Sequence, residues 1–318
     1  MPKTIIKLDR KSNRDIRKKI RFFYVEKFFN KWMSKYLYPS LNYQQTHYIM
    51  KKFWSEGTIA CSRISEANDV LAGLMKNGFI DMGSNELIFT PYAPSRRYNI
   101  YDFMTHVRLI NVRGVKFITN KELEIDKDVV IIYAQKNHKS VWSSIEAKVE
   151  EIIDLEMKKR CALKSQTQPW LFTFSPEDRD NAKILQEQMD DDNPYLFAPF
   201  NDPTNVKGIV SGAPYIVDKI QAQIDGRVNE VLTMLGVNNI GVDEKKEHLI
   251  VDEVNANNED INQQSYSFQS EIENGFARVK KCFGVDVPII DLNDIIKEEE
   301  DNSSDDEDDK EDDENESE

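Results

Sequence analysis

The sequence predicts a mainly α protein with small β regions, that is, an α+β chain. Residues 141–165 and 211–236 each repeat apolar residues at helical spacing. Residues 85–135 contain instead short, β-branched and apolar runs of the kind that form strands. Hydrophobic residues make up 40% of the 318 positions, which is enough to build a buried core around these elements.

Charge is concentrated at the two ends of the chain. The formal net charge is −14, but residues 297–318 alone hold fifteen acidic residues and two lysines, so the body is nearly neutral. Residues 1–35 carry twelve Lys or Arg against three acids. We expect a basic N-terminal arm over residues 1–20 and a disordered acidic tail over residues 297–318. The tail either keeps the chain soluble, repels DNA or meets a basic partner.

Cysteine usage and hydropathy narrow the protein class. Cys61, Cys161 and Cys282 are odd in number and irregularly spaced, which argues against a disulfide framework and for a reducing compartment. No apolar run approaches the length of a membrane span. No apolar segment follows the basic start at the distance of a signal peptide, so we expect neither a membrane protein nor a secreted one.

The first half of the chain begins with an aromatic helix. Phe22, Phe29 and Tyr36 are seven residues apart, and Phe28 and Trp32 are four apart, which places the rings on one side of a helix. We expect this side to pack into a core; the alternative is stacking on nucleic-acid bases. Two or three further helices are expected over residues 42–82. The runs ELIFTPYAP, VRGVKFITN and DVVIIYAQ are expected as strands.

The second half contains two long helices around an inserted module. The first is capped by Ser143 or Ser144, and its basic residues lie late, as the helix dipole favours. Five prolines exclude one helix over residues 166–210; PWLFTFS is strand-like, PEDRDNAKILQEQMDD forms a short helix and NPYLFAPF is extended.

The second long helix is expected to begin at Pro214 and to stop at Gly236. Gly226 lies inside it and weakens it by about 1 kcal/mol relative to alanine. Residues 237–258 form a long polar loop, and helix returns over residues 259–283.

The sequence contains no signature of catalysis. It has no Walker loop, dinucleotide-binding glycine fingerprint, paired Cys-x-x-Cys or Gly-x-Ser-x-Gly elbow, and its four histidines lack metal-ligand spacing. We therefore expect no enzyme, cofactor or metal. The alternative is a metal-dependent nuclease, whose ligands would be the clustered acids Asp178, Asp180, Asp190, Asp191 and Asp192; the simpler interpretation is that these acids are solvated.

Residues 211–287 carry a specific resemblance. The runs APYIVDKIQAQIDGRVNEVLTMLGV, DEKKEHLIVDEVNANNEDI and RVKKCFGVDV follow one another in the order seen in the upper collar protein of phi29-type podophages. This family comprises portal, or head–tail connector, proteins. Outside residues 211–287 the chain resembles it in total length and in the order of its elements. The long acidic tail departs from the family's less charged C-terminus.

The resemblance implies that twelve subunits form a dodecameric ring and that each subunit consists of a stem, a clip, a wing and a channel loop. The stem helices would be residues 141–165 and 211–236, with the clip at residues 166–210 between them. Residues 21–140 would form the wing, residues 259–296 its returning helix and C-terminal segment, and residues 237–258 the channel loop.

The family also implies a role in the virion of a bacteriophage, at one capsid vertex. The subunit would be structural, would be made in the cytoplasm of the bacterial host, and would surround double-stranded DNA during packaging, retention and ejection. Its partners would be the major capsid protein, the lower collar or tail protein, the packaging ATPase and, in the family, a packaging RNA. The rival interpretation is a monomeric nucleic-acid-binding accessory protein of replication or packaging.

Two sets of basic residues are candidates for nucleic-acid contact. A nearly neutral body suits a channel that does not grip DNA, and isolated lysines repeated around a ring would form weak positive belts. The alternative for each lysine is an ordinary solvated surface residue. The candidate channel residues are Lys207, Lys219, Lys245 and Lys246. The candidate residues of the basic arm, which in the family contacts the packaging RNA, are Lys7, Arg10, Lys11, Arg14, Arg17, Lys18, Lys19 and Arg21.

Overall fold

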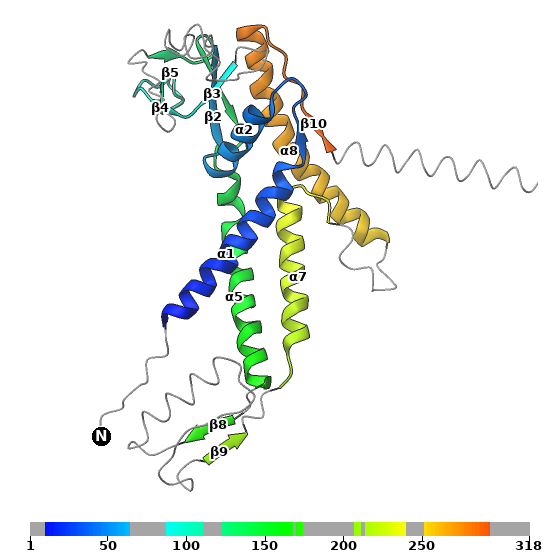
Figure 1. The fold of residues 1–318 in the computed structure, drawn as a ribbon. Helices are drawn as coiled ribbons and strands as arrows, with labels where there is room; N and C mark the ends of the chain where they lie inside the picture. The colour runs from blue at the N-terminus through cyan, green and yellow to red at the C-terminus, as the bar shows by residue number, and fades with distance from the viewer. Residues whose placement is uncertain are drawn as a thin grey trace, which may run out of the picture. The chain divides into compact units, whose positions relative to one another are not determined.

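The structure is a computed structural model that describes residues 10–63, 87–110, 122–167, 170–173, 207–210, 214–239 and 251–292 (Figure 1). The chain divides into two compact units. The first combines Met1–Ile20 with Glu150–Val228, and the second combines Arg21–Val149 with Asn229–Glu318. Helices dominate the described residues and the strands form small antiparallel sheets, so the predicted mainly α, α+β class is confirmed.

Helix α1 (Arg10–Met33) supplies aromatic side chains to the core of the second unit. Phe28 and Trp32 are fully buried. The Trp32 ring lies 6.1 Å from that of Phe268 and 6.0 Å from that of Trp54, the latter on helix α2 (Tyr43–Ser55). The predicted packing of the aromatic side is confirmed for these residues and is wrong for Phe22, which is 67% exposed.

Strand β2 (Thr58–Arg63) forms the centre of a three-stranded sheet. It pairs with β3 (Leu87–Thr90) on one side and with β7 (Val129–Tyr133) on the other. The prediction of helices over residues 42–82 is therefore right for α2 and wrong for β2; residues 64–82 lie outside the described residues. A strand buried on both faces lacks alternation, so its short apolar run does not distinguish it from a helix.

The remaining strands of the second unit form two further sheets. One holds β4 (Tyr92–Pro94), β5 (His106–Leu109) and β6 (Leu123–Glu124), and the other pairs β1 (Tyr36–Leu37) with β10 (Ile290–Asp291). The predicted β character of residues 85–135 is confirmed, although the run VRGVKFITN lies outside the described residues.

We call the sheet of β3, β2 and β7 the central sheet of the second unit. Helix α8 (Val251–Phe283) packs against it. A side chain at Gly275 would place its Cβ 2.5 Å from Cγ2 of Ile132 on β7, so glycine is required by close packing here. The predicted helix start near residue 259 is wrong, and the predicted loop loses its last eight residues to α8.

Helices α5 (Val141–Thr167) and α7 (Val217–Met234) are the two predicted long helices. The backbone N–H of Ser143 donates to Oγ of Ser140 at 3.2 Å, so Ser140 caps α5, not Ser143 or Ser144 as predicted. Helix α7 begins three residues after the predicted Pro214. Its end is as predicted: Gly236 has a φ of 63°, and the N–H of Val237 donates to the carbonyl of Leu232 at 2.9 Å.

The chain between these helices contributes one antiparallel pair of strands to the described residues. Strand β8 (Trp170–Thr173) pairs with β9 (Lys207–Val210), which confirms the predicted strand PWLFTFS. The expected short helix PEDRDNAKILQEQMDD and the extended run NPYLFAPF lie outside the described residues.

Candidate nucleic-acid interface

Helices α5 and α7 lie antiparallel in the first unit. Lys159 Nζ donates to Oε1 of Gln221 at 2.7 Å, and further along the pair Arg227 Nε lies 3.2 Å from Oε2 of Glu151. Each helix also buries a stripe of apolar residues at helical spacing. These residues are Ile152 and Ile153 on α5 and Val217, Ile220, Ile224 and Val228 on α7. Both helices therefore present a polar surface to their surroundings.

The charges on this polar surface are nearly balanced. Residues 150–167 hold four acids and four bases, and residues 217–234 hold three acids and two bases. Affinity for DNA grows with every phosphate that a protein neutralises. Such a balance offers few uncompensated positive charges to a phosphate backbone.

The structure describes the four candidate channel lysines to different extents. Lys219 is exposed in the first turn of α7, and no described residue forms an ion pair with it. Lys207 begins β9, where it pairs with Thr173; its side chain lies outside the described residues. Lys245 and Lys246 lie outside them altogether. Of the four candidates, Lys219 is therefore the one that the structure places as an exposed cation.

Arg17 of the basic arm is bound within the first unit. Its Nη1 lies 2.5 Å from Oδ1 of Asp154 and its Nη2 lies 2.8 Å from Oε2 of Glu150, both on α5. The hydrogen bonds to Glu150 and Asp154 raise the pKa of the Arg17 guanidinium above its ordinary value. The side chain thus anchors α1 to α5 and has two carboxylates as partners in place of phosphates.

Arg21 makes an equivalent contact within the second unit. Its Nη2 lies 2.6 Å from Oε1 of Glu146, and its guanidinium carbon lies 5.6 Å from the centre of the Trp142 ring. The ring contact is a cation–π interaction that adds to the ion pair. Arg21, like Arg17, therefore has a structural role in the described chain.

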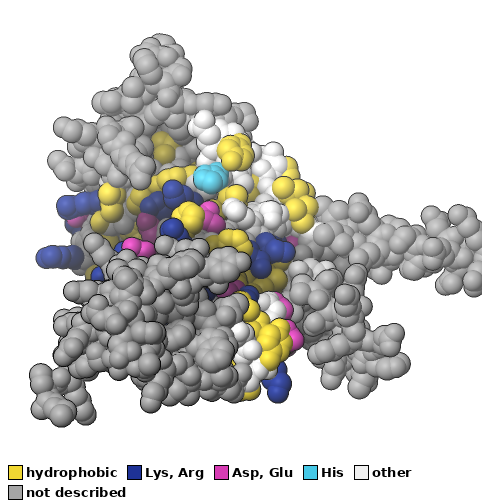
Figure 2. Space-filling view, turned by 60° about the horizontal axis from the view of Figure 1, so that its bottom comes forward, with side chains coloured by type: hydrophobic (Ala, Val, Ile, Leu, Met, Phe, Trp, Pro, Cys, Tyr) yellow, Lys and Arg dark blue, Asp and Glu magenta, His cyan; other side chains and the backbone are white. Residues whose placement is uncertain are grey.

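Three other arm residues face solvent. Arg14, Lys18 and Lys19 are exposed on α1, and among the described residues none of them has an ion-pair partner. We call them the exposed α1 bases. The side chains of Arg10 and Lys11, and all of Lys7, lie outside the described residues. On the face drawn in Figure 2, the Lys and Arg side chains form separate groups with acidic and hydrophobic side chains between them.

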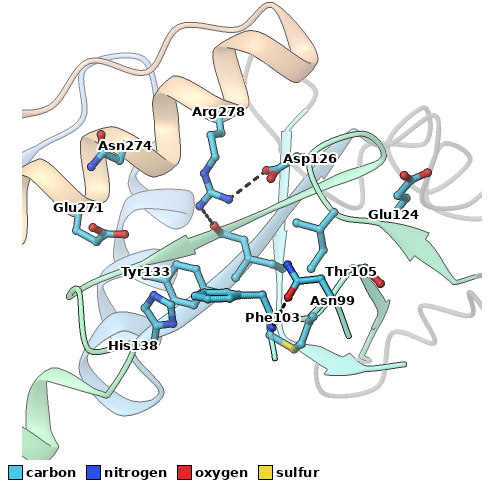
Figure 3. A pocket seen from close by; sticks show the side chains of 13 residues that line it. Asn99, Phe103, Thr105, Glu124, Asp126, Tyr133, His138, Glu271, Asn274 and Arg278 are labelled. Atoms are coloured by element: carbon cyan, nitrogen blue, oxygen red, sulfur yellow. Dashed lines mark hydrogen bonds and ion pairs between the residues drawn. The ribbon is translucent and has the colours of Figure 1, made fainter. Parts of the chain in front are cut away.

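The second unit contains a cavity of about 520 Å³ next to the central sheet (Figure 3). The His138 ring stacks on Tyr133 at 3.7 Å, and burial raises the pKa of Tyr133 to about 12. Arg278 donates to Oδ1 of Asp126 at 3.1 Å and to the carbonyl of Ile131. The arginine is therefore held by its own chain, and the cavity mixes one base with several acids.

The described residues show no metal centre and no membrane helix. No group of three or more His, Cys, Asp or Glu side chains among them is arranged to hold a metal ion. The acids that a nuclease would need, from Asp178 to Asp192, lie outside these residues. None of the described helices is both long and apolar enough to cross a membrane.

Sequence reasoning missed the contacts between α1 and α5, although a signal for them exists. Glu146, Glu150 and Asp154 are four residues apart, so they share one face of α5, and Arg17 and Arg21 share one face of α1. The cavity of Figure 3 carried no such signal, because its lining comes from β-region loops, β7 and α8, which are far apart in the sequence.

These observations define a class: an α+β protein with a long antiparallel helix pair whose surface charges nearly balance. A family model described as Phage Connector (GP10) matches residues 3–296, so the chain belongs to the phage connector family. The predicted resemblance to portal, or head–tail connector, proteins of phi29-type podophages is thereby confirmed. The family is structural and belongs to the capsid vertex of the virion. Among solved structures, the chain is similar to "Portal and tail of native bacteriophage P68", with a TM-score of 0.41, 14% identity, and coverage of 94% of this chain and 98% of that chain.

Proposed function

We propose that this connector subunit assembles into a closed dodecameric ring through which double-stranded DNA is packaged, retained and later ejected. The family match over residues 3–296 carries the proposal. A ring of identical subunits needs a head-to-tail interface whose rotation closes. The subunit acts without catalysis of its own, so DNA movement is driven by a separate packaging ATPase.

Each part of the chain takes a role in this proposal. Residues 141–165 and 211–236, which include most of α5 and all of α7, form the stem, and residues 166–210 form the clip. Residues 21–140 form the wing, together with the returning helix and C-terminal segment of residues 259–296. The channel loop is residues 237–250, since α8 begins at Val251. The wing contacts the major capsid protein and the clip contacts the lower collar or tail protein. Assembly takes place in the host cytoplasm.

The channel contacts DNA weakly at several levels along its axis. Lys219 supports this idea because it is an exposed cation without an ion-pair partner among the described residues, on a surface whose acids and bases nearly balance when it is included. Repeated around the ring it becomes a belt of positive charge. Lys207, Lys245 and Lys246 would supply further belts. Such belts screen phosphates without the many simultaneous contacts that stop sliding.

The exposed α1 bases form a separate nucleic-acid contact outside the channel. Arg14, Lys18 and Lys19 are the arm residues best suited to it, since Arg17 and Arg21 are occupied by carboxylates of α5. A packaging RNA is the partner that the family suggests for this arm. The acidic tail, residues 297–318, would keep the DNA path away from the surface that carries it.

Native mass spectrometry of the purified full-length protein, supported by negative-stain images, tests the proposal. We expect a closed ring of about twelve subunits with a central hole. A monomer at every salt and protein concentration would contradict the proposal. It would favour the rival function, a monomeric nucleic-acid-binding accessory protein that uses the exposed α1 bases.

A further inference from the structure

The proposed function gives no role to the cavity of about 520 Å³ beside the central sheet (Figure 3). One wall of this cavity is aromatic. The His138 ring stacks on the Tyr133 ring, with the ring centres 3.7 Å apart and the planes 12° from parallel. The Phe103 ring lies 6.1 Å from His138 in a T-shaped arrangement. Cavities of about 300–1,000 Å³ hold small molecules, so this one is large enough to be a binding site.

The charged groups of the cavity are mostly acidic. The acids Glu124, Asp126 and Glu271 line it. The base Arg278 lines it too, but its guanidinium already donates to Oδ1 of Asp126 at 3.1 Å. Lys127 likewise lies 3.0 Å from Oε2 of Glu124. Glu271 has no ion-pair partner among the described residues, so its carboxylate remains available to a ligand.

The acids also act on the aromatic wall. Burial raises the pKa of Tyr133 to about 12, and the negative charges of Asp126 and Glu271 contribute to the rise while Arg278 opposes it. The Tyr133 phenol is therefore uncharged at neutral pH, and the wall offers ring faces in place of an anion. The face of an aromatic ring is its negative part. The cavity thus combines the Glu271 carboxylate with ring faces, and both attract positive charge.

Other classes of ligand fit the cavity less well. An anion would meet the Glu271 carboxylate, and an apolar molecule would cover this carboxylate without giving it a partner, which is costly. A divalent metal ion prefers several oxygen ligands, and no group of three or more His, Cys, Asp or Glu side chains within the described ranges is arranged to hold one. A cation on an apolar stem satisfies both the carboxylate and the rings.

We propose that this cavity binds an organic cation, that is, an ammonium or guanidinium group carried on an apolar stem. The cation pairs with the carboxylate of Glu271, and the stem lies against the rings of Phe103, Tyr133 and His138. A free alkylamine and a lysine or arginine side chain of a partner protein share this chemistry. The inference goes beyond the proposed ring function and does not depend on it, because all of these residues belong to one subunit.

Saturation-transfer NMR on the full-length protein tests the proposal with two monovalent probes. n-Butylamine represents a free amine, and N-acetyl-L-arginine methylamide represents the side chain of a partner. We expect saturable binding of at least one probe, with a Kd below about 10 mM. Tighter binding of n-butylamine would assign the site to a free amine, and tighter binding of the arginine derivative would assign it to a side chain. No saturable binding of either probe would overturn the proposal.

Two pairs of variants connect the binding to the cavity. Glu271→Gln keeps the shape of the side chain and is expected to weaken binding about tenfold or more, because a charge-assisted contact is lost. Glu273→Gln is its matched control on α8, since Glu273 is exposed, accepts a hydrogen bond from Gln269 at 2.9 Å and does not line the cavity. Both variants keep the acidic tail, so binding of the probes to the tail does not produce a difference between them.

The second pair tests the aromatic wall. Phe103→Ala is expected to weaken binding about threefold, because the cation loses one ring. Tyr101→Ala is the control, since Tyr101 is exposed on the same loop but does not line the cavity. Phe103 is 55% exposed, so we expect its variant to fold, as circular dichroism will check.

Three results would overturn the proposal. The first is equal binding by the Glu271→Gln and Glu273→Gln variants. The second is equal binding by the Phe103→Ala and Tyr101→Ala variants. The third is binding of N-acetyl-L-glutamate methylamide, an anion, as tightly as the arginine derivative, because charge would then not decide what enters the cavity.

Discussion

Replacing Asp291 with asparagine removes one charge of a buried ion pair in the second unit. The Nζ of Lys35 lies 3.6 Å from Oδ2 of Asp291, and the two side chains are only 2% and 1% exposed. Ser265 Oγ also donates a hydrogen bond to this carboxylate. The variant keeps the shape of the side chain but leaves the Lys35 ammonium buried without its counter-charge.

The expected loss is about 3–5 kcal/mol in the free energy of unfolding, the usual result when one partner of a buried ion pair is removed. This is a large part of the roughly 5–15 kcal/mol that stabilises a typical protein. The double variant Lys35→Met/Asp291→Asn removes both charges and is expected to recover most of the loss, since the desolvation cost of the lone ammonium disappears.

Urea unfolding followed by circular dichroism, at one fixed protein concentration because subunit association stabilises the folded state, measures these changes. Asp286→Asn is the matched control: its pair with Lys280 spans 2.9 Å but the two side chains are 66% and 60% exposed, so a loss below about 1 kcal/mol is expected. If Asp291→Asn and Asp286→Asn lowered the free energy of unfolding by similar amounts, the reasoning that burial of the ion pair determines the loss of stability would be refuted.

Three further outcomes are expected. Gly275→Ala lowers the melting temperature, because the clash of its Cβ with Ile132 costs about 1–3 kcal/mol and outweighs a gain of about 1 kcal/mol in helix propensity; an unchanged or higher melting temperature would contradict this. Replacing Lys245 and Lys246 with glutamine leaves ring assembly intact and impairs retention of packaged DNA, as measured by nuclease sensitivity of filled particles; normal retention would remove these lysines from the mechanism. Replacing the exposed α1 bases with glutamine weakens RNA and DNA binding in low-salt filter-binding assays and reduces its salt dependence, whereas unchanged binding would exclude them as a nucleic-acid contact.

The periodicity of apolar residues in the sequence predicted the helices that bury only one face. Helices α5 and α7 each bury one apolar stripe, so their spacing shows in the sequence, and their observed bounds differ from the predicted ones by a few residues. The position of Gly236 as a helix stop could also be predicted, since a left-handed backbone at the end of a helix favours glycine.

Periodicity failed where tertiary packing decides the structure. Strand β2 is buried on both faces, so it shows no alternation, and the polar start of α8 shows no apolar stripe. Phe22 has the spacing of a core residue but lies exposed, so spacing alone does not tell which rings of α1 are covered. The roles of Arg17 and Arg21 depend on which helix lies opposite them, and charge content alone does not contain that information.

An asymmetric cryo-electron microscopy reconstruction of DNA-filled particles, with this subunit tagged, tests the central claim most directly. We expect one tagged ring at a single capsid vertex, with density for a DNA duplex along its axis and the helix pair α5 and α7 around it. Tagged subunits spread over many vertices, or a ring without DNA on its axis in filled particles, would contradict the account.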